Sequence, residues 1–165
     1  MKNLKILGID PGFGRTGYGV IEVEGHNNYK TLTFGVFETE KHLPHHERLK
    51  MIYEKMTELL DEFKPQRLAI EELFFHKNVT TALGVGEARG VIMLAAAQRG
   101  LPITECSPLN VKLTITGNGR AEKRQVQKMI QILLRLDQMP KPDDAADALA
   151  VALTAARSVW QESLL

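Results

Sequence analysis

Four carboxylates in this 165-residue chain have the types and spacing that suit binding of a divalent cation. Asp10 and Glu71 each end a short apolar run, the position where α/β sheets place ligand-binding groups. Asp144 and Asp147 are three residues apart, so a helix presents both on one face. Oxygen ligands without histidine or cysteine favour the hard cations Mg²⁺ and Mn²⁺.

Carboxylates that converge in this way repel one another and destabilise a fold unless a cation lies between them. Two divalent cations about 4 Å apart hold both the attacking and the leaving oxygen of an in-line phosphoryl displacement. The pattern therefore predicts a phosphodiester hydrolase that uses two Mg²⁺ ions per active site, for which Mn²⁺ can substitute.

Some of these carboxylates also have a purely structural explanation. The turn after Asp10 could be only a turn, and Asp144 could mark only the start of a helix. The neighbouring Asp143 could join the acidic group or simply cap that helix. Asp147 favours the metal site more strongly, because it lies between two alanines in a mostly apolar helix, where an unpaired carboxylate is costly.

The charges of the chain are unevenly distributed, although the net charge is only +1. Residues 136–147 contain four acidic side chains and one basic side chain, a local charge of −3. A strip at residues 112–135 has six basic side chains and one acidic side chain, a local charge of +5. The basic residues are Lys112, Arg120, Lys123, Arg124, Lys128 and Arg135. Such a strip predicts binding to a nucleic-acid backbone, or it is an ordinary solvated helix face.

The apolar periodicity places these residues on the elements of a single domain that spans residues 1–165. Short apolar or alternating runs predict strands, and apolar residues in steps of three and four predict helices. Three strands, a helix and then alternating strands and helices imply an α/β fold, a mixed sheet with helices on its faces. The predicted strands are 5–10, 16–24, 29–38, 68–70 and 102–105, and the predicted helices are 44–63, 79–99, 121–136 and 143–159, with a short helix capped by Ser107.

Composition excludes several classes of protein. The chain is 44% apolar and 25% charged, which is typical of a globular domain, and no apolar run approaches the ~20 residues of a membrane span. The single Cys106 excludes an internal disulfide and fits a reducing cytoplasm. The glycines Gly84, Gly86 and Gly90 in one predicted helix indicate that another backbone approaches closely, either a partner subunit or the molecule's own sheet.

Six sequence blocks together closely resemble the RuvC family of Holliday junction resolvases. They occur in the family's order and spacing over residues 5–156, nearly the whole chain. The blocks are ILGIDPG with TGYGV (residues 6–20), AIEELF (69–74), ARGV (88–91), SPLNVK (107–112), TGNGRAEK (116–123) and DAADALA (144–150).

This resemblance implies a ribonuclease H-like fold with a five-stranded mixed sheet flanked by helices. It also implies a homodimer that acts in recombination and repair by nicking two opposed strands of a four-way DNA junction. The nicked strands would carry 5′-phosphate and 3′-hydroxyl ends. The branch-migration proteins RuvA and RuvB are implied partners.

The resemblance also assigns roles to residues. The family's four metal-binding acidic positions fall on the four carboxylates named above. Lys112 and Lys123 match the lysines that support junction binding and cleavage. The charge pattern, independently of the resemblance, adds Arg120, Arg124 and Lys128 to the predicted DNA-binding residues. Phe74 matches the aromatic that stacks at the junction centre, with Phe75 as the alternative.

Three other functions are compatible with part of the pattern. An actin-like kinase also begins with a strand and an acidic loop, but it needs a second lobe that 165 residues do not supply. Another ribonuclease H-like nuclease, acting on RNA, would share the four acids. A non-catalytic junction-binding module would bind DNA without cleaving it.

Overall fold

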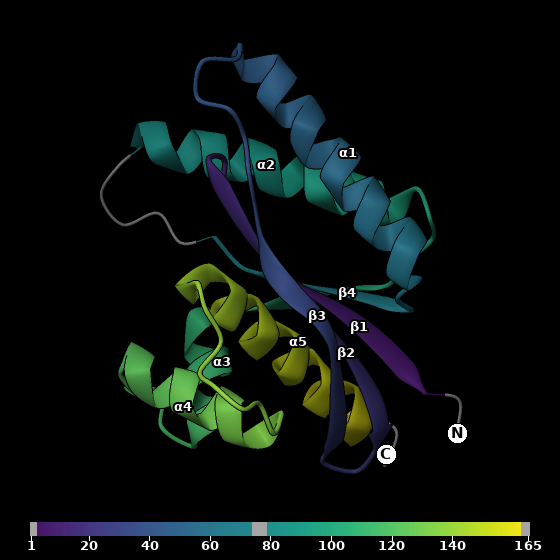
Figure 1. The fold of residues 1–165 in the computed structure, drawn as a ribbon, viewed down its shortest axis with the longest axis vertical. Coiled ribbons are helices and arrows are strands. Elements are labelled where there is room, and N and C mark those ends of the chain that lie inside the picture. The colour runs from purple at the N-terminus through teal and green to yellow at the C-terminus, as the bar shows by residue number, and fades with distance from the viewer. Residues whose placement is uncertain (1–2, 74–78, 163–165) are drawn as a thin grey trace.

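The computed structural model describes residues 3–73 and 79–162 and contains a five-stranded sheet covered by helices on both faces (Figure 1). The strands are β1 (Leu4–Asp10), β2 (Arg15–Gly25), β3 (Asn28–Glu38), β4 (Arg67–Glu71) and β5 (Ile103–Cys106). The helices are α1 (His45–Phe63), α2 (Val79–Ala97), α3 (Pro108–Thr116), α4 (Lys123–Leu133) and α5 (Asp143–Glu162). Within the described part of the chain, no helix is long and apolar enough to cross a membrane.

The sheet is mixed, as predicted, with the strand order β3-β2-β1-β4-β5. Strands β1, β2 and β3 form an antiparallel meander, and β4 and β5 continue the sheet parallel to β1. Because β1 and β4 are neighbours and parallel, their carboxyl ends lie at the same edge of the sheet.

Side-chain alternation along the strands gives the sheet two separate apolar faces. Leu7, Ile9 and Ile70 point to the face covered by α1 and α2. Ile6 and Ala69 point to the face covered by α3, α4 and α5. In Figure 1 the sheet accordingly separates the pair α1 and α2 from the group formed by α3, α4 and α5.

Helix α5 packs directly on β1 and β2 because glycines leave room for its backbone. A Cβ atom placed on Gly8 would lie 2.1 Å from the carbonyl oxygen of Ala148, and one on Gly17 would lie 2.0 Å from that of Asp144. Gly8 is two residues before Asp10 and therefore shares its face of the sheet, while Gly17 pairs with Asp10 across the strands. The sequence around these glycines therefore places the start of α5 over the end of β1.

Most predicted elements are confirmed to within two residues at each end, and Ser107 caps α3 as predicted, accepting a hydrogen bond from the Asn110 amide. Helix α4 is shorter than the predicted 121–136. Glu122 and Gln125 form a capping box at its start, and the chain leaves the helix before Arg135, whose φ of 52° is left-handed.

The glycines of α2 have different surroundings. Gly84 packs against the side chain of Phe13, which lies in the loop after β1, so its close neighbour is a side chain of the molecule itself and not the backbone that was predicted. A Cβ atom placed on Gly90 would meet no described atom within 4 Å. Cys106 is buried in the core beside α5, and burial raises the pKa of its thiol to about 11, which agrees with a packing role.

We expect Gly8→Ala to destabilise the fold by about 2–3 kcal/mol, because the added methyl group must push α5 off the sheet. Urea unfolding followed by circular dichroism measures the effect. Gly86→Ala is the matched control, since its nearest described neighbour is Leu73 at 3.7 Å. In a helix this control should stabilise by up to about 1 kcal/mol. Equal behaviour of the two variants would refute the packing argument.

Candidate metal centre

Two of the four predicted carboxylates come from neighbouring strands. Ile9 pairs with Ile70 in the parallel register of β1 and β4, so the next residues along each strand, Asp10 and Glu71, end their strands side by side. Alternation turns both side chains to the face that carries α5, away from Ile9 and Ile70. The sequence and the sheet register thus bring these two carboxyl groups together.

The first turns of α5 supply the other two carboxylates. Asp144 and Asp147 lie on the side of the helix that faces the sheet edge, and each is partly buried. One oxygen atom from each of Asp10, Asp144 and Asp147 lies within 4.8 Å of the others. Glu71 adjoins this group closely enough that its charge acts on Asp10. All four predicted acidic residues therefore converge at one place.

Cationic side chains surround this acidic group. Lys123 Nζ, at the start of α4, lies 3.1 Å from Asp147 Oδ2 and 3.3 Å from Asp143 Oδ2. Arg15 Nη1, at the start of β2, lies 3.7 Å from Asp144 Oδ2. Arg15 is also held by Glu38, whose carboxylate accepts from its Nε at 2.6 Å.

A cleft of about 230 Å³ opens beside the carboxylates. Glu71 and Asp147 line one part of it, and Lys112 and Lys123 line another, with apolar residues of α3, α4 and α5 between them. The cleft therefore presents acidic and basic groups to the same small volume, as a site for a metal-bound phosphate requires.

Burial and mutual repulsion perturb the carboxyl groups. Burial, together with the charges of Glu71, Asp147 and Asp144, raises the pKa of Asp10 from 3.8 to about 8. Burial also raises the pKa of Glu71 and of Asp147, and in each case the ammonium of Lys123 opposes the shift.

Lys123 and Asp143 respond in the opposite sense. Burial favours the uncharged form of Lys123, but its hydrogen bonds with Asp147 and Asp143 outweigh this and raise the pKa of its ammonium. Hydrogen bonds from Gln127 and Lys123 lower the pKa of Asp143. Asp143 is exposed and bonded to those two residues, outside the three-oxygen cluster, which fits the helix-start alternative better than a metal ligand.

The donor set fits a divalent cation. All candidate ligands are carboxylates, whose hard oxygens suit metals such as Mg²⁺, Mn²⁺ or Ca²⁺. Burial first, and then repulsion between the carboxylates, raises the pKa of Asp10, Glu71 and Asp147, so their charged forms are disfavoured in spite of the nearby cations. A bound metal would supply the missing positive charge.

The predicted DNA-binding residues divide into three groups. Lys112 and Lys123 lie in the cleft. Arg120, Arg124 and Lys128 are exposed beside it, in the loop before α4 and along the outer face of that helix. Phe74 and its alternative Phe75 lie outside the described residues.

Arg15 is a site residue that the sequence did not reveal. It is separated from Asp144 by 129 positions, and only the packing of α5 on β2 brings the two together. The available signal was its place two residues before Gly17, the residue paired with Asp10, but this requires knowledge of the strand register.

Comparison with known proteins gives concordant results. A family model described as "Crossover junction endodeoxyribonuclease RuvC" matches residues 6–155. A curated protein of that description from Thermosipho melanesiensis is 56% identical over 149 residues, which cover 90% of this chain and 94% of the relative. One from Thermotoga maritima is 51% identical over 152 residues, covering 92% and 90%.

Solved structures agree with this. The Thermus thermophilus RuvC in complex with Holliday junction substrate has a TM-score of 0.92 and 36% identity, with 96% of each chain covered. The yeast mitochondrial resolvase Ydc2, at 16% identity and a TM-score of 0.71, shares the fold. The predicted ribonuclease H-like fold with a five-stranded mixed sheet is confirmed.

We expect Asp10→Asn to stabilise the protein in EDTA at pH 8, raising its melting temperature by about 3 °C or more, because the change removes a charge that the fold disfavours. The raised pKa means that the folded protein holds a proton that the unfolded chain releases. The stabilisation that this proton on Asp10 gives the folded state is complete below about pH 4 and is lost as the pH rises to about 8.

Thermal denaturation in EDTA from pH 5 to pH 8.5 measures this effect. The wild type should lose stability across this range, and the variant should lose less. Asp137→Asn changes an exposed acid outside the cluster and serves as the control. A variant that melts below the wild type at pH 8 contradicts the prediction.

Proposed function

This chain belongs to the RuvC family of crossover junction endodeoxyribonucleases, and on that premise we propose that Asp10, Glu71, Asp144 and Asp147 hold two Mg²⁺ ions at its active site. The protein is a nuclease that resolves Holliday junctions. Family nucleases are metal-dependent, and the acidic cluster provides the corresponding site. The choice of Mg²⁺, with Mn²⁺ as a substitute, and the count of two ions are parts of the proposal.

The single observation that carries the proposal is the convergence of carboxylate oxygens from β1 and α5 within 4.8 Å. Held by Asp10, Glu71, Asp144 and Asp147, two divalent cations would supply activation of an attacking water and stabilisation of charge on the leaving 3′-oxygen. The carboxylates fix the position of that chemistry at the sheet edge, and the products are a 5′-phosphate and a 3′-hydroxyl.

The basic residues of the cleft hold the scissile strand. Lys112 and Lys123 line the cleft together with Glu71 and Asp147, so they reach a phosphate that enters it. We assign them the role of contacting that phosphate and stabilising its developing negative charge. Arg15 Nη1 lies 3.7 Å from Asp144 Oδ2 and adds a third cation at the edge of the acidic group.

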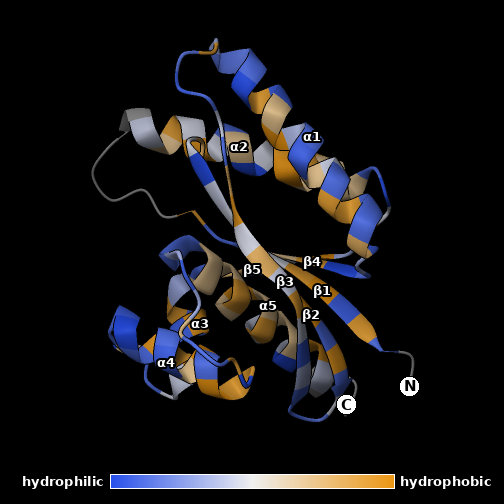
Figure 2. Cartoon of the chain, viewed as in Figure 1, coloured by the Kyte–Doolittle hydropathy of each residue, from blue (hydrophilic) through white to orange (hydrophobic). Residues whose placement is uncertain are grey.

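A basic track extends from the cleft along α4. Arg124 and Lys128 lie on its exposed side and both line two adjoining hollows of about 620 and 540 Å³. The blue outer face of α4 in Figure 2 shows this polar side of the helix. Together with Arg120 these residues bind the phosphates of a DNA arm, and Phe74 supplies the aromatic at the junction centre.

A homodimer suits a junction with two opposed strands, since a two-fold protein matches a two-fold substrate. The exposed face of α2 supports a contact there. Leu83 and Leu94 are 61% and 53% exposed and share this face with Gly90, at helical spacing. Close approach at a bare glycine lets two helices pack backbone to backbone.

The remaining parts of the proposal rest on the family. Residues 1–165 act as one nuclease domain, matched over residues 6–155. RuvA and RuvB are the partners that move the junction, and the bacterial cytoplasm, where chromosomal DNA lies, is the place of action.

The proposed function predicts paired symmetric nicks in a labelled four-way junction with Mg²⁺ and none with EDTA. Asp10→Asn should bind the junction and cleave it at least about a hundredfold more slowly, because loss of even a supporting group at a metal site costs up to that factor. A matched linear duplex and an RNA duplex are the substrate controls.

Each other outcome has a defined meaning. Cleavage of RNA or linear duplex in place of the junction indicates a different ribonuclease H-like nuclease. Tight junction binding without cleavage indicates a binding module. Cleavage by Asp10→Asn at nearly the wild-type rate would contradict the assignment of Asp10 as a metal ligand.

The basic track predicts a steep salt dependence of junction binding. The slope of log K against log [salt] is negative, and replacement of one phosphate contact makes it shallower by about 0.9. We therefore expect Arg124→Gln and Lys128→Gln each to make this slope shallower by that amount between about 50 and 200 mM salt. Lys50→Gln is the control, because Lys50 is exposed on α1, which covers the opposite face of the sheet. Equal slopes for all variants would exclude the track.

The proposed dimer contact predicts that Gly90→Glu converts dimers to monomers in sedimentation velocity at micromolar concentration. The charged side chain would enter the interface without a partner. Lys55→Glu, on the exposed side of α1, should leave the dimer intact. A wild type that sediments only as a monomer contradicts the dimer, and a dimeric Gly90→Glu variant contradicts its location.

A further inference from the structure

Glu71 lies at the margin of the acidic cluster. Oxygen atoms of Asp10, Asp144 and Asp147 lie within 4.8 Å of one another, and Glu71 adjoins this group without belonging to it. Glu71 is also the last residue of β4, so its side chain moves with the end of a strand. The contacts that hold the backbone at this point therefore decide how closely the Glu71 carboxylate approaches the other acids.

A proline removes the usual ladder partner of the Glu71 carbonyl group. Glu72 donates to the Cys106 carbonyl oxygen of β5 at 2.9 Å, so the preceding residue, Glu71, turns its carbonyl toward β1. Asp10 lies opposite Glu71, and in a regular parallel ladder the residue after Asp10 donates to this carbonyl. That residue is Pro11, which has no N–H group.

Arg89 of α2 supplies a donor to this carbonyl. Its Nε donates to the Glu71 carbonyl oxygen at 3.1 Å, and its Nη2 donates to the carboxylate of Glu105 on β5. Glu105 pairs with Ile70 across the strands, so its side chain points to the face of the sheet that α2 covers. The guanidinium therefore reaches the end of β4 from the face opposite the acidic cluster.

These contacts require the shape of an arginine. Nε and Nη2 form one edge of the guanidinium, and their parallel N–H groups engage two neighbouring strands at once. A lysine carries one ammonium on a flexible stem and does not reproduce this fixed fork. The Arg89 side chain is 17% exposed, so water competes little for its hydrogen bonds. Arg89 thus fixes the end of β4 to both β5 and α2.

We propose that Arg89 is a positioning residue of the nuclease, which holds the Glu71 backbone from the far face of the sheet and so sets the place of the Glu71 carboxylate in the metal site. This inference rests on the proposed role of Glu71 as a metal ligand. Small displacements matter there, because the groups of a functional site must be held within about 0.5 Å of their productive geometry. Glu105 acts one step further out, by orienting the guanidinium.

Binding of Mn²⁺ to the full-length protein without DNA tests the position of Glu71 apart from catalysis. Isothermal titration calorimetry gives the dissociation constant. Arg89→Gln should weaken Mn²⁺ binding about tenfold, the lower end of the loss expected when a supporting partner of a metal ligand is removed. Arg89→Lys should also weaken it, because the charge remains but the fork is lost. Glu105→Gln should have a smaller effect in the same direction.

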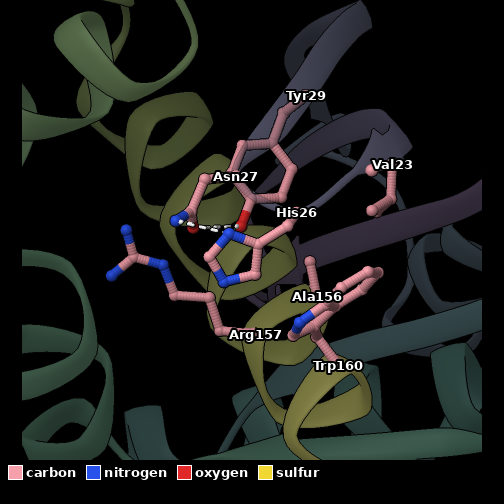
Figure 3. A pocket seen from close by; sticks show the side chains of 8 residues that line it. Val23, His26, Asn27, Tyr29, Ala156, Arg157 and Trp160 are labelled. Atoms are coloured by element: carbon pink, nitrogen blue, oxygen red, sulfur yellow. Dashed lines mark hydrogen bonds between the residues drawn. The ribbon is translucent and has the colours of Figure 1, made fainter. Parts of the chain in front are cut away.

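Two other arginines separate positioning from a general loss of stability. Arg99, just after α2, binds Asp61 of α1, with Nη2 2.8 Å from Oδ1. Arg157 donates to the Thr114 carbonyl oxygen and lines a pocket of about 310 Å³ at the end of α5 remote from the acids (Figure 3). Arg99→Gln removes another anchor of α2, and Arg157→Gln removes another bond from an arginine to a backbone carbonyl. Both variants should bind Mn²⁺ as the wild type does, whatever their melting temperatures.

Single-turnover cleavage of a four-way junction provides a second measurement. The Arg89 variants should need more Mg²⁺ than the wild type for half of their maximal rate, and high Mg²⁺ should restore part of the lost rate. Their affinity for the junction in EDTA should equal that of the wild type, because Arg89 reaches the sheet from the face opposite the basic track.

The outcomes distinguish this inference from the proposed function. A wild type that binds no Mn²⁺, or a Glu71→Gln variant that binds it as tightly as the wild type, contradicts the metal-ligand role of Glu71 and with it the inference. Normal Mn²⁺ binding in both Arg89 variants, with Glu71→Gln impaired, overturns the positioning role alone. Equal losses in Arg89→Gln and the two control variants also overturn it, because they would reflect stability. If Arg89→Gln does not fold, Arg89→Lys and Glu105→Gln decide the question.

Discussion

The close contact of α5 with β1 and β2 is the constraint on which the catalytic arrangement depends. Gly8 and Gly17 have no side chains, so the helix backbone lies within van der Waals distance of the strands. Any larger residue at these positions would move the start of α5 away from the sheet edge. The carboxylates of Asp144 and Asp147 would then withdraw from Asp10. The same contact buries much of α5, so the apolar core provides the free energy that holds the acids together.

That arrangement opposes stability, because the acids repel one another and lie partly buried. The pKa of Asp10 rises to about 8 even though Lys123 lies nearby. Lys123 and Arg15 contact Asp147 and Asp144 at the boundary of the group, where they reduce the repulsion. A cation bound between the carboxylates would remove more of the repulsion than these side chains at the boundary do. The residual electrostatic strain is therefore the physical basis of affinity for a divalent metal.

Much of the fold was predictable because its signals are local. Strand alternation, the cap at Ser107 and the apolar runs before Asp10 and Glu71 are properties of short segments, and each predicted the correct element. The ion pair between Arg15 and Asp144 depends on a contact between distant segments, which no local pattern encodes. The early end of α4 depends on the left-handed backbone at Arg135, a residue type that ordinarily continues a helix. Convergence of the four acids could be predicted from the family blocks, but their charge state required the structure.

The two faces of the sheet allow separate functions in one small domain. Alternating side chains divide the core into two clusters that share the strands but no side chains. The face with α3, α4 and α5 carries the acids and the basic track, while α2 on the other face presents the exposed Leu83 and Leu94. A partner bound at α2 therefore leaves the cleft open to a strand.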